Sequence, residues 1–153
     1  MGPLAEPTNW AIVLVTAFII GIVIALHYEM LQGCIRFLPS LAHRRRRRVV
    51  ILIFVILFTH AVEIWIFAFG YYFLLQFERF GNIIGSVDLV TMVDHAYFSG
   101  MVYTTVGFGD FVPHGPIRFT AGMEALTGLV MITWSASFTF LEMQRDWPHD
   151  RRV

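Results

Sequence analysis

Residues 104–110, with the sequence TTVGFGD, bring two hydroxyl side chains, two glycines and one acid into a chain that is 57% apolar. Glycine adopts backbone conformations that are closed to other residues. Because the two glycines alternate with Val106 and Phe108, successive carbonyls can point to one side and the two bulky side chains to the other. One chain would then offer a column of oxygens with the Thr105 hydroxyl at its foot. Oxygens arranged around an axis are hard ligands, which suit alkali cations rather than soft metals.

Apolar stretches of membrane-spanning length occur three times in the chain. A helix needs about 20 residues, at about 1.5 Å each, to cross roughly 30 Å of hydrocarbon, and residues 10–28, 49–75 and 117–143 meet this requirement. Only 14% of the 153 residues are charged, a composition typical of membrane proteins. The residues before the first stretch include no basic residue, so we expect a retained span rather than a cleaved signal peptide. The sequence therefore predicts an all-α membrane protein with three transmembrane helices.

The arginines predict how these helices are oriented. All eleven basic residues are arginine. Only Arg79, between the second and third spans, and Arg118, at the start of the third, lie in this part of the chain. The others lie between the first two spans or after the third. Because positive residues are enriched in cytoplasmic loops, we expect an integral protein of the plasma (inner) membrane. Its N-terminus and residues 76–116 would lie outside, and its C-terminus would lie in the cytoplasm.

Five consecutive arginines precede the second span. We interpret this run as a topology anchor that contacts anionic lipid, rather than as a nucleic-acid patch, and we expect no nucleic-acid partner. Consecutive arginines point all round a helix and lie outside the apolar stretch, which argues against a voltage sensor. The run consists of Arg44, Arg45, Arg46, Arg47 and Arg48.

The segment between the first span and the arginine run has two interpretations. Apolar residues recur at helical spacing between residues 29 and 41, opposite a polar side that includes Glu29 and Arg36. This pattern predicts an amphipathic helix on the inner membrane surface, broken near Pro39. Alternatively, the first span simply continues into the cytoplasm. Cys34, the single cysteine, cannot form an intrachain disulfide, and we assign it to packing.

A short helix is predicted between the second and third spans. Thr91 and Asp94 have the Thr-x-x-Asp spacing of a capping box, so we expect a helix over Met92–Tyr103, about 18 Å long. A helix this short cannot cross the membrane and must enter and stop. Residues 104–110 would then begin near mid-membrane and return to the outer surface. Irregular backbone at that depth is tolerated only where it is buried in protein or lines a water-filled path.

These features together resemble potassium channels. The TTVGFGD tract is similar to their selectivity filter, in which backbone carbonyls replace the hydration shell of the ion. The resemblance implies passive, potassium-selective conduction, with no enzymatic activity and no cofactor apart from the permeant K⁺ ions. It implies a filter of Thr105, Val106, Gly107, Phe108 and Gly109, the first four of which bind K⁺. It implies filter support from Thr104, Asp110, Tyr97, Phe98 and Met101.

The resemblance covers residues 92–144 and leaves the first span without a counterpart. It makes residues 49–75 the outer helix and residues 117–143 the inner helix. We expect no regulatory domain after the inner helix. The expected domains are residues 1–48 with the extra span, residues 49–144 with the pore, and residues 145–153 as a short cytoplasmic tail.

The inner helix carries further expected site residues. Gly128 lies where the family has a hinge glycine, and a small residue that allows close helix packing is an equal alternative. If the helix register holds, four residues face the conduction path, with Phe140 near the cytoplasmic constriction. The four are Leu129, Ile132, Ala136 and Phe140.

One chain supplies one column of oxygens, whereas an ion that loses its water needs oxygens on all sides. The resemblance implies a homotetramer with cyclic symmetry and the extra span at its periphery. One alternative is a non-conducting or less selective accessory subunit of a larger cation channel. Another is a membrane-embedded hydrolase or metalloenzyme that uses His60, Glu63 and Glu124, but it leaves the Gly-Phe-Gly tract unexplained and lacks a nucleophile constellation.

Ionisable residues lie inside two of the spans. His60 and Glu63 are three residues apart on one helix face, and Glu124 lies in the third span. Such residues suggest function by default, here a proton sensor. We favour the alternative that they pair with each other or with nearby hydroxyls and orient the helices. His95, beside Asp94, is expected at the start of the short helix, with too few ligands for a metal site.

The aromatic residues near the filter differ from the family pattern. In its common Gly-Tyr-Gly filter, the tyrosine hydroxyl bonds to an aromatic donor on the pore helix. Phe108 has no hydroxyl, and Phe98, at the matching place, has no donor. We therefore expect an apolar contact between Phe98 and Phe108. Tyr97 remains available as a donor to Asp110 at the outer mouth.

Overall fold

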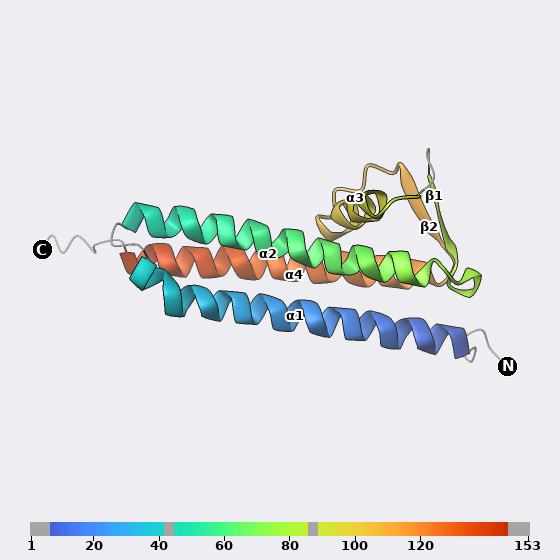
Figure 1. Ribbon diagram of the computed structural model, residues 1–153, viewed down its shortest axis with the longest axis horizontal. Helices are drawn as coiled ribbons and strands as arrows, with labels where there is room; N and C mark the ends of the chain where they lie inside the picture. Colours follow the sequence, from blue (N-terminus) through green and yellow to red (C-terminus); the bar gives the residue numbers. More distant parts are fainter. Residues whose placement is uncertain (1–6, 42–44, 86–88, 147–153) are drawn as a thin grey trace, which may run out of the picture.

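Three long helices dominate the computed structural model, which describes residues 7–41, 45–85 and 89–146 (Figure 1). Helix α1 covers Pro7–Leu41, helix α2 covers Arg45–Leu74, and helix α4 covers Ile117–Asp146. Each contains a stretch of 28 or 29 residues that is apolar enough to cross a membrane. The prediction of an all-α membrane protein with three spans is therefore confirmed.

Helix α1 extends well past the first predicted span. It is one element to Leu41, and its membrane-length stretch is Asn9–Phe37. The apolar side of its second half packs on α2, where Cys34 and Leu52 form a buried cluster. The helix does not end at Pro39, which favours the alternative in which the first span continues. The position of its second half relative to the membrane surface stays a prediction.

Four short elements connect α2 to α4. In chain order they are the 3₁₀ helix η2 (Glu78–Phe80), strand β1 (Asn82–Gly85), helix α3 (Met92–Tyr103) and strand β2 (Phe111–His114). The strands form an antiparallel pair in which Asn82 lies opposite His114 and Gly85 lies opposite Phe111. The sequence analysis did not predict these strands. They connect the two ends of the re-entrant segment next to the start of α4.

Helix α3 begins and ends where the capping pattern predicts. The Thr91 hydroxyl accepts from the Asp94 N–H at 3.2 Å, and the Asp94 carboxylate accepts from the Thr91 N–H at 2.7 Å. Hydrogen bonds from the Thr91 backbone and hydroxyl hold the pKa of Asp94 below its usual value. Their contribution to stability is present above the unfolded-state pKa and is lost as the pH falls through the lowered folded-state pKa.

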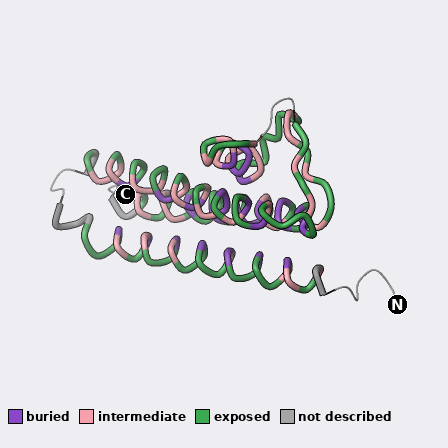
Figure 2. The backbone as a smooth tube through the Cα atoms, turned by 45° about the vertical axis from the view of Figure 1, so that its right-hand side comes forward, coloured by how far each residue is buried: buried purple, intermediate pink, exposed green. Residues whose placement is uncertain are grey.

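The long helices and the re-entrant segment lie in three layers. Figures 1 and 2 both show α1 on one side of α2 and α4, and α3 on the other side. Figure 2 also shows that the buried residues of α1 lie on the side that faces the other helices. One hydrophobic cluster joins all four helices, through Ile19 of α1, Phe67 of α2, Phe98 of α3 and Met131 of α4. We call the end of the bundle near β1 and β2 the sheet end and the opposite end the arginine end.

Candidate functional site

The tract of residues 104–110, which follows α3, has a backbone of alternating handedness. Thr105, Gly107 and Gly109 have φ angles of 58°, 51° and 80°, whereas Val106 and Phe108 between them have no positive φ. Alternation between positive and non-positive φ allows successive peptide groups to turn to the same side. The backbone therefore has the pattern that an aligned column of carbonyls requires.

Thr105 is the feature of this backbone that sequence reasoning missed. Among the described residues, Thr105 is the only residue other than glycine that has a positive φ. A left-handed conformation costs a residue with a side chain about 1–2 kcal/mol. Strain of this kind persists only where the surroundings impose it, and it is concentrated at functional sites. The glycine pattern alone could not reveal it, because threonine ordinarily avoids this conformation.

The inner part of the tract is attached to the last turn of α3. The Thr104 hydroxyl donates to the Gly100 carbonyl at 2.6 Å, and the Gly107 N–H donates to the Met101 carbonyl at 3.2 Å. Met101, expected to support the tract, therefore does so through its backbone oxygen.

The outer end of the tract has one side-chain attachment. The Tyr97 hydroxyl donates to the Asp110 carboxylate at 2.8 Å, which is the hydrogen bond expected from the sequence. The Tyr97 ring also lies edge-on to Phe111, with the centroids 6.0 Å apart. The tract is thus held at both ends by its own chain.

Between these attachments the tract is open. Residues 104–109 are all exposed in the single chain, and the apolar side chains of Val106 and Phe108 are 53% and 71% exposed. A protein that crosses a membrane does not leave such backbone facing lipid. The groups that cover this surface must therefore come from outside the single chain.

The predicted contact between Phe98 and Phe108 is wrong. Phe98 is only 2% exposed, because its ring packs edge-on against Tyr71 and Phe111 of its own chain, at centroid distances of 5.0 and 6.4 Å. It has no free face for Phe108 of the same chain or of another copy. Phe98 supports the tract by fixing α3 to α2 and β2.

A buried carboxylate fixes the middle of α3. Glu124 of α4 is fully buried. It accepts hydrogen bonds from the Tyr71 hydroxyl of α2 and from the Ser99 hydroxyl of α3, the latter at 2.5 Å. The Ser99 hydroxyl also lies 2.9 Å from the Ile64 carbonyl of α2. These contacts tie the re-entrant helix to both helices on which it lies.

A second buried carboxylate fixes the end of α3. Glu63 of α2 accepts from the Tyr103 hydroxyl, and its two oxygens lie 2.8 Å from His27 Nδ1 and 2.9 Å from His60 Nδ1. Tyr103 is the last residue before the tract. We call Glu63 and Glu124, with their hydroxyl partners Tyr71, Ser99 and Tyr103, the polar bed.

The polar bed shows how the predicted ionisable residues are paired. His60 and Glu63 contact each other as expected, and hydroxyls complete the set, which agrees with the favoured structural role. Glu124 has partners of its own. His27 was missed because the first span was predicted to end at residue 28, which placed His27 at the membrane interface. The observed stretch continues to residue 37, so the rule that flagged His60 applies equally to His27.

Gly128 lies where α4 crosses the end of α3. A Cβ atom added there would collide with the carbonyl oxygen of Tyr103 and approach its ring to 3.0 Å. The close-packing interpretation of Gly128 is therefore confirmed. Movement about this glycine stays a prediction.

The expected path-lining residues of α4 are exposed in the single chain: Leu129, Ile132, Ala136 and Phe140. The last three also line a groove of about 480 Å³ between α2 and α4, together with His60 and Ser135. Their exposure agrees with the predicted helix register.

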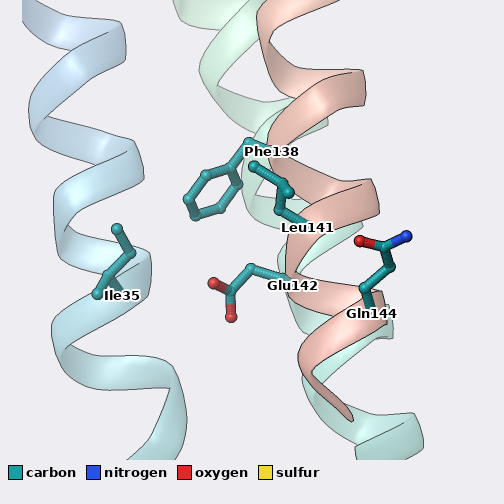
Figure 3. Close-up of a pocket in the computed structure, with 5 residues that line it drawn as sticks. All are labelled: Ile35, Phe138, Leu141, Glu142 and Gln144. Atoms are coloured by element: carbon teal, nitrogen blue, oxygen red, sulfur yellow. The ribbon is translucent and has the colours of Figure 1, made fainter. Parts of the chain in front are cut away.

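A second groove, of about 500 Å³, lies at the arginine end. Figure 3 shows Ile35 of α1 facing Phe138 and Glu142 of α4 across it.

Two other expectations concern polar residues at the helix ends. His95 lies at the start of α3 as predicted, with Nδ1 2.7 Å from the Thr91 carbonyl. Arg44 lies outside the described residues, as do the side chains of Arg45 and Arg46. Arg47 is exposed, and the lipid contact of this run stays a prediction.

The fold and the tract define a class: an integral membrane protein with a short re-entrant helix and a carbonyl tract between two spans. A family model described as "Ion channel" matches residues 49–145, from α2 to α4 and more than half of the chain. The chain belongs to this ion-channel family, of the potassium-channel type with two spans around a pore segment. Helix α1 is an additional span before the matched region. Comparisons with curated proteins and with solved structures gave no match.

Proposed function

We propose that the protein is a potassium-selective channel that conducts K⁺ passively across the membrane. The observation that carries the proposal is the alternating backbone of the exposed tract, with positive φ at Thr105, Gly107 and Gly109. Carbonyls aligned in this way replace the hydration shell of K⁺. The oxygens of Thr105, Val106, Gly107 and Phe108 would bind the ion, and Gly109 would complete the filter.

The working unit in this proposal is a homotetramer around the filter. One chain offers one column of oxygens and leaves it open, so further copies must complete the ligand shell by cyclic symmetry. The exposed residues of α4 would line the path below the filter. Because α1 lies on the opposite side of α2 and α4 from α3 (Figure 1), it would lie at the periphery.

The proposed orientation follows from charge. The sheet end would face outward, and the arginine end would lie in the cytoplasm, by the positive-inside tendency. The membrane would be the plasma (inner) membrane, and the arginines before α2 would contact anionic lipid.

The test is flux into proteoliposomes that contain only this protein. We expect K⁺ uptake that collapses when the K⁺ gradient is removed, and little uptake of Na⁺ under the same gradient. Equal permeation of the two ions would contradict potassium selectivity. A tetrameric mass without flux would instead indicate a non-conducting accessory subunit.

The mass of the protein in mild detergent tests the assembly separately. We expect four copies in the particle that carries flux. A stable monomer or dimer with intact flux would contradict the tetramer.

A further inference from the structure

Two histidines and one glutamate converge between α1 and α2. His27 of α1 and Glu63 of α2 are 1% and 0% exposed, and His60 of α2 is 14% exposed. One ligand atom from each residue lies within 4.8 Å of the other two. The family match begins at residue 49, so His27 lies outside it, on the additional span.

We propose that His27, His60 and Glu63 form a binding site for a divalent transition-metal ion such as Zn²⁺. Imidazole nitrogen and carboxylate oxygen are ligands that zinc prefers, and two histidines with one glutamate form a known catalytic-type zinc ligand set. The site is separate from the oxygen column of the tract, whose carbonyls are hard ligands.

The distances fit this ion after a small adjustment. Zinc-to-nitrogen and zinc-to-oxygen bonds of about 2.0–2.2 Å with tetrahedral angles place neighbouring ligand atoms about 3.3 Å apart. The N···O distances here are 2.8 Å from His27 to Glu63 and 2.9 Å from His60 to Glu63. An ion would widen each by about half an ångström.

The surroundings provide the partners that metal ligands require. A histidine that binds a metal usually gives its other ring N–H to an oxygen, which fixes its tautomer. The Nε2 atom of His27 lies 3.2 Å from the Ser135 hydroxyl of α4, which leaves Nδ1 for the ion. The Tyr103 hydroxyl, 3.0 Å from His60 Nδ1, is placed to take the fourth position or to hold the carboxylate.

An ion can reach this site from the groove between α2 and α4. His60 and Ser135 both line that groove, which has a volume of about 480 Å³. One face of the cluster, at His60, thus opens to this groove, while His27 and Glu63 are buried. A bound ion would also connect α1 directly to the matched part of the chain, next to the residue that precedes the tract.

The test is metal binding by the purified full-length protein, without an affinity tag of histidines and after treatment with a chelator. We expect one Zn²⁺ per chain in a calorimetric titration. Co²⁺ bound in its place should give visible absorption bands of a four-coordinate nitrogen and oxygen site. Neither readout depends on K⁺ flux, so the outcome is independent of the proposed channel function.

Substitutions of the proposed ligands test whether the ion binds at this site. His27→Gln and Glu63→Gln should each weaken binding by about 100-fold or more, and Ser135→Ala by about 10-fold, the range found for outer partners of metal ligands. The matched controls are His95→Gln, whose ring nitrogen contacts a backbone carbonyl, and Glu124→Gln, a buried carboxylate bound to hydroxyls alone. Both controls should bind as the unchanged protein does.

Two results would overturn the proposal. One is the absence of Zn²⁺ and Co²⁺ binding by the unchanged protein at about 100 μM metal, far above the dissociation constants of structural zinc sites. The other is undiminished binding by both ligand variants. If Glu63→Gln does not fold, His60→Gln, at the more exposed ligand, replaces it with the same expected loss.

Discussion

Residues 104–109 are exposed in the single chain, whereas Glu63 and Glu124 of the neighbouring polar bed are completely buried. The apolar side chains of Val106 and Phe108, between the two attachments of the tract, are 53% and 71% exposed. Among the described residues, by contrast, no buried side-chain nitrogen or oxygen lacks a hydrogen-bond partner. The chain therefore completes the support of the tract alone and leaves the surface of the tract to be covered by groups from outside the single chain.

The physical reason for this difference is the cost of burial. A buried carboxylate without hydrogen bonds is too costly to keep, so Glu63 and Glu124 must be satisfied as soon as the chain folds. The exposed part of the tract, residues 104–109, has no charged side chain, and water and ions can satisfy its neutral carbonyls. The alignment of these carbonyls therefore depends on the backbone conformation. Substitutions in the tract should mainly change ion flux, whereas substitutions in the polar bed should mainly lower the free energy of unfolding.

The largest expected effect is that of Gly107→Ala. Its φ of 51° is rarely adopted by a residue with a side chain, and a tetramer would contain the strain four times. We expect loss of K⁺ flux or of selectivity over Na⁺ in proteoliposomes. Gly21→Ala is the control, because an added Cβ on Gly21 of α1 meets no atom within 4 Å. Retained selective flux in Gly107→Ala would contradict the proposed filter.

Phe140→Ala tests the exposed face of α4. Phe140 is 60% exposed in the single chain, and an apolar ring formed by four copies would block ions by excluding water. We expect a higher resting flux after the substitution. Leu141→Ala, at a neighbouring residue that lines the other groove (Figure 3), should leave flux unchanged. An unchanged flux in Phe140→Ala would indicate control at the filter.

Gly128→Ala distinguishes packing from hinge movement. The added methyl group collides with the Tyr103 carbonyl, and overpacking typically costs about 1–3 kcal/mol. We expect a loss of this size in the free energy of unfolding in detergent, together with reduced flux. Gly122→Ala on the same helix meets no atom within 4 Å and should be neutral. Unchanged stability with altered opening would instead support a hinge at Gly128.

Glu124→Leu probes the polar bed. It leaves the Tyr71 hydroxyl without its buried partner, whereas the Ser99 hydroxyl keeps the Ile64 carbonyl. An unsatisfied buried group costs about 1–3 kcal/mol. Hydrogen bonds between membrane helices are often worth less, so we expect a loss near 1 kcal/mol in unfolding free energy. Glu124→Gln keeps an acceptor and should lose less. Equal losses in the two variants would show that side-chain shape, not hydrogen bonding, determines the effect.

The smallest expected effect is the coupling between Phe108→Tyr and Phe98→Trp. Phe98 is enclosed by its own chain, so Phe98→Trp should overpack and destabilise the protein by about 1–3 kcal/mol. Phe108→Tyr should be tolerated. Because the two rings do not meet, the effects should add to within about 0.5 kcal/mol in a double-mutant cycle. A larger coupling would show that assembly brings Phe98 and Phe108 together.

Local signals in the sequence determined the helix that carries the tract. The bounds of α3 follow from a capping box between Thr91 and Asp94, which acts over three residues. The left-handed conformation of Gly107 and Gly109 follows from the absence of a side chain. The spans follow from apolar length, and the family follows from the tract and the spans together. These inferences require no information about which residues are neighbours in space.

Tertiary structure alone decided which partners these elements have. The contacts of Glu63 join residues 36 and 40 positions away in the chain, and no local pattern specifies such a pairing. Phe98 was predicted to face the tract but packs on Tyr71, because α3 lies directly on α2. His27 became apparent only once α1 was seen against its neighbours, although the sequence had already offered the continuation of the first span as an alternative. Caps and glycines act within a few residues, whereas burial depends on how whole helices pack.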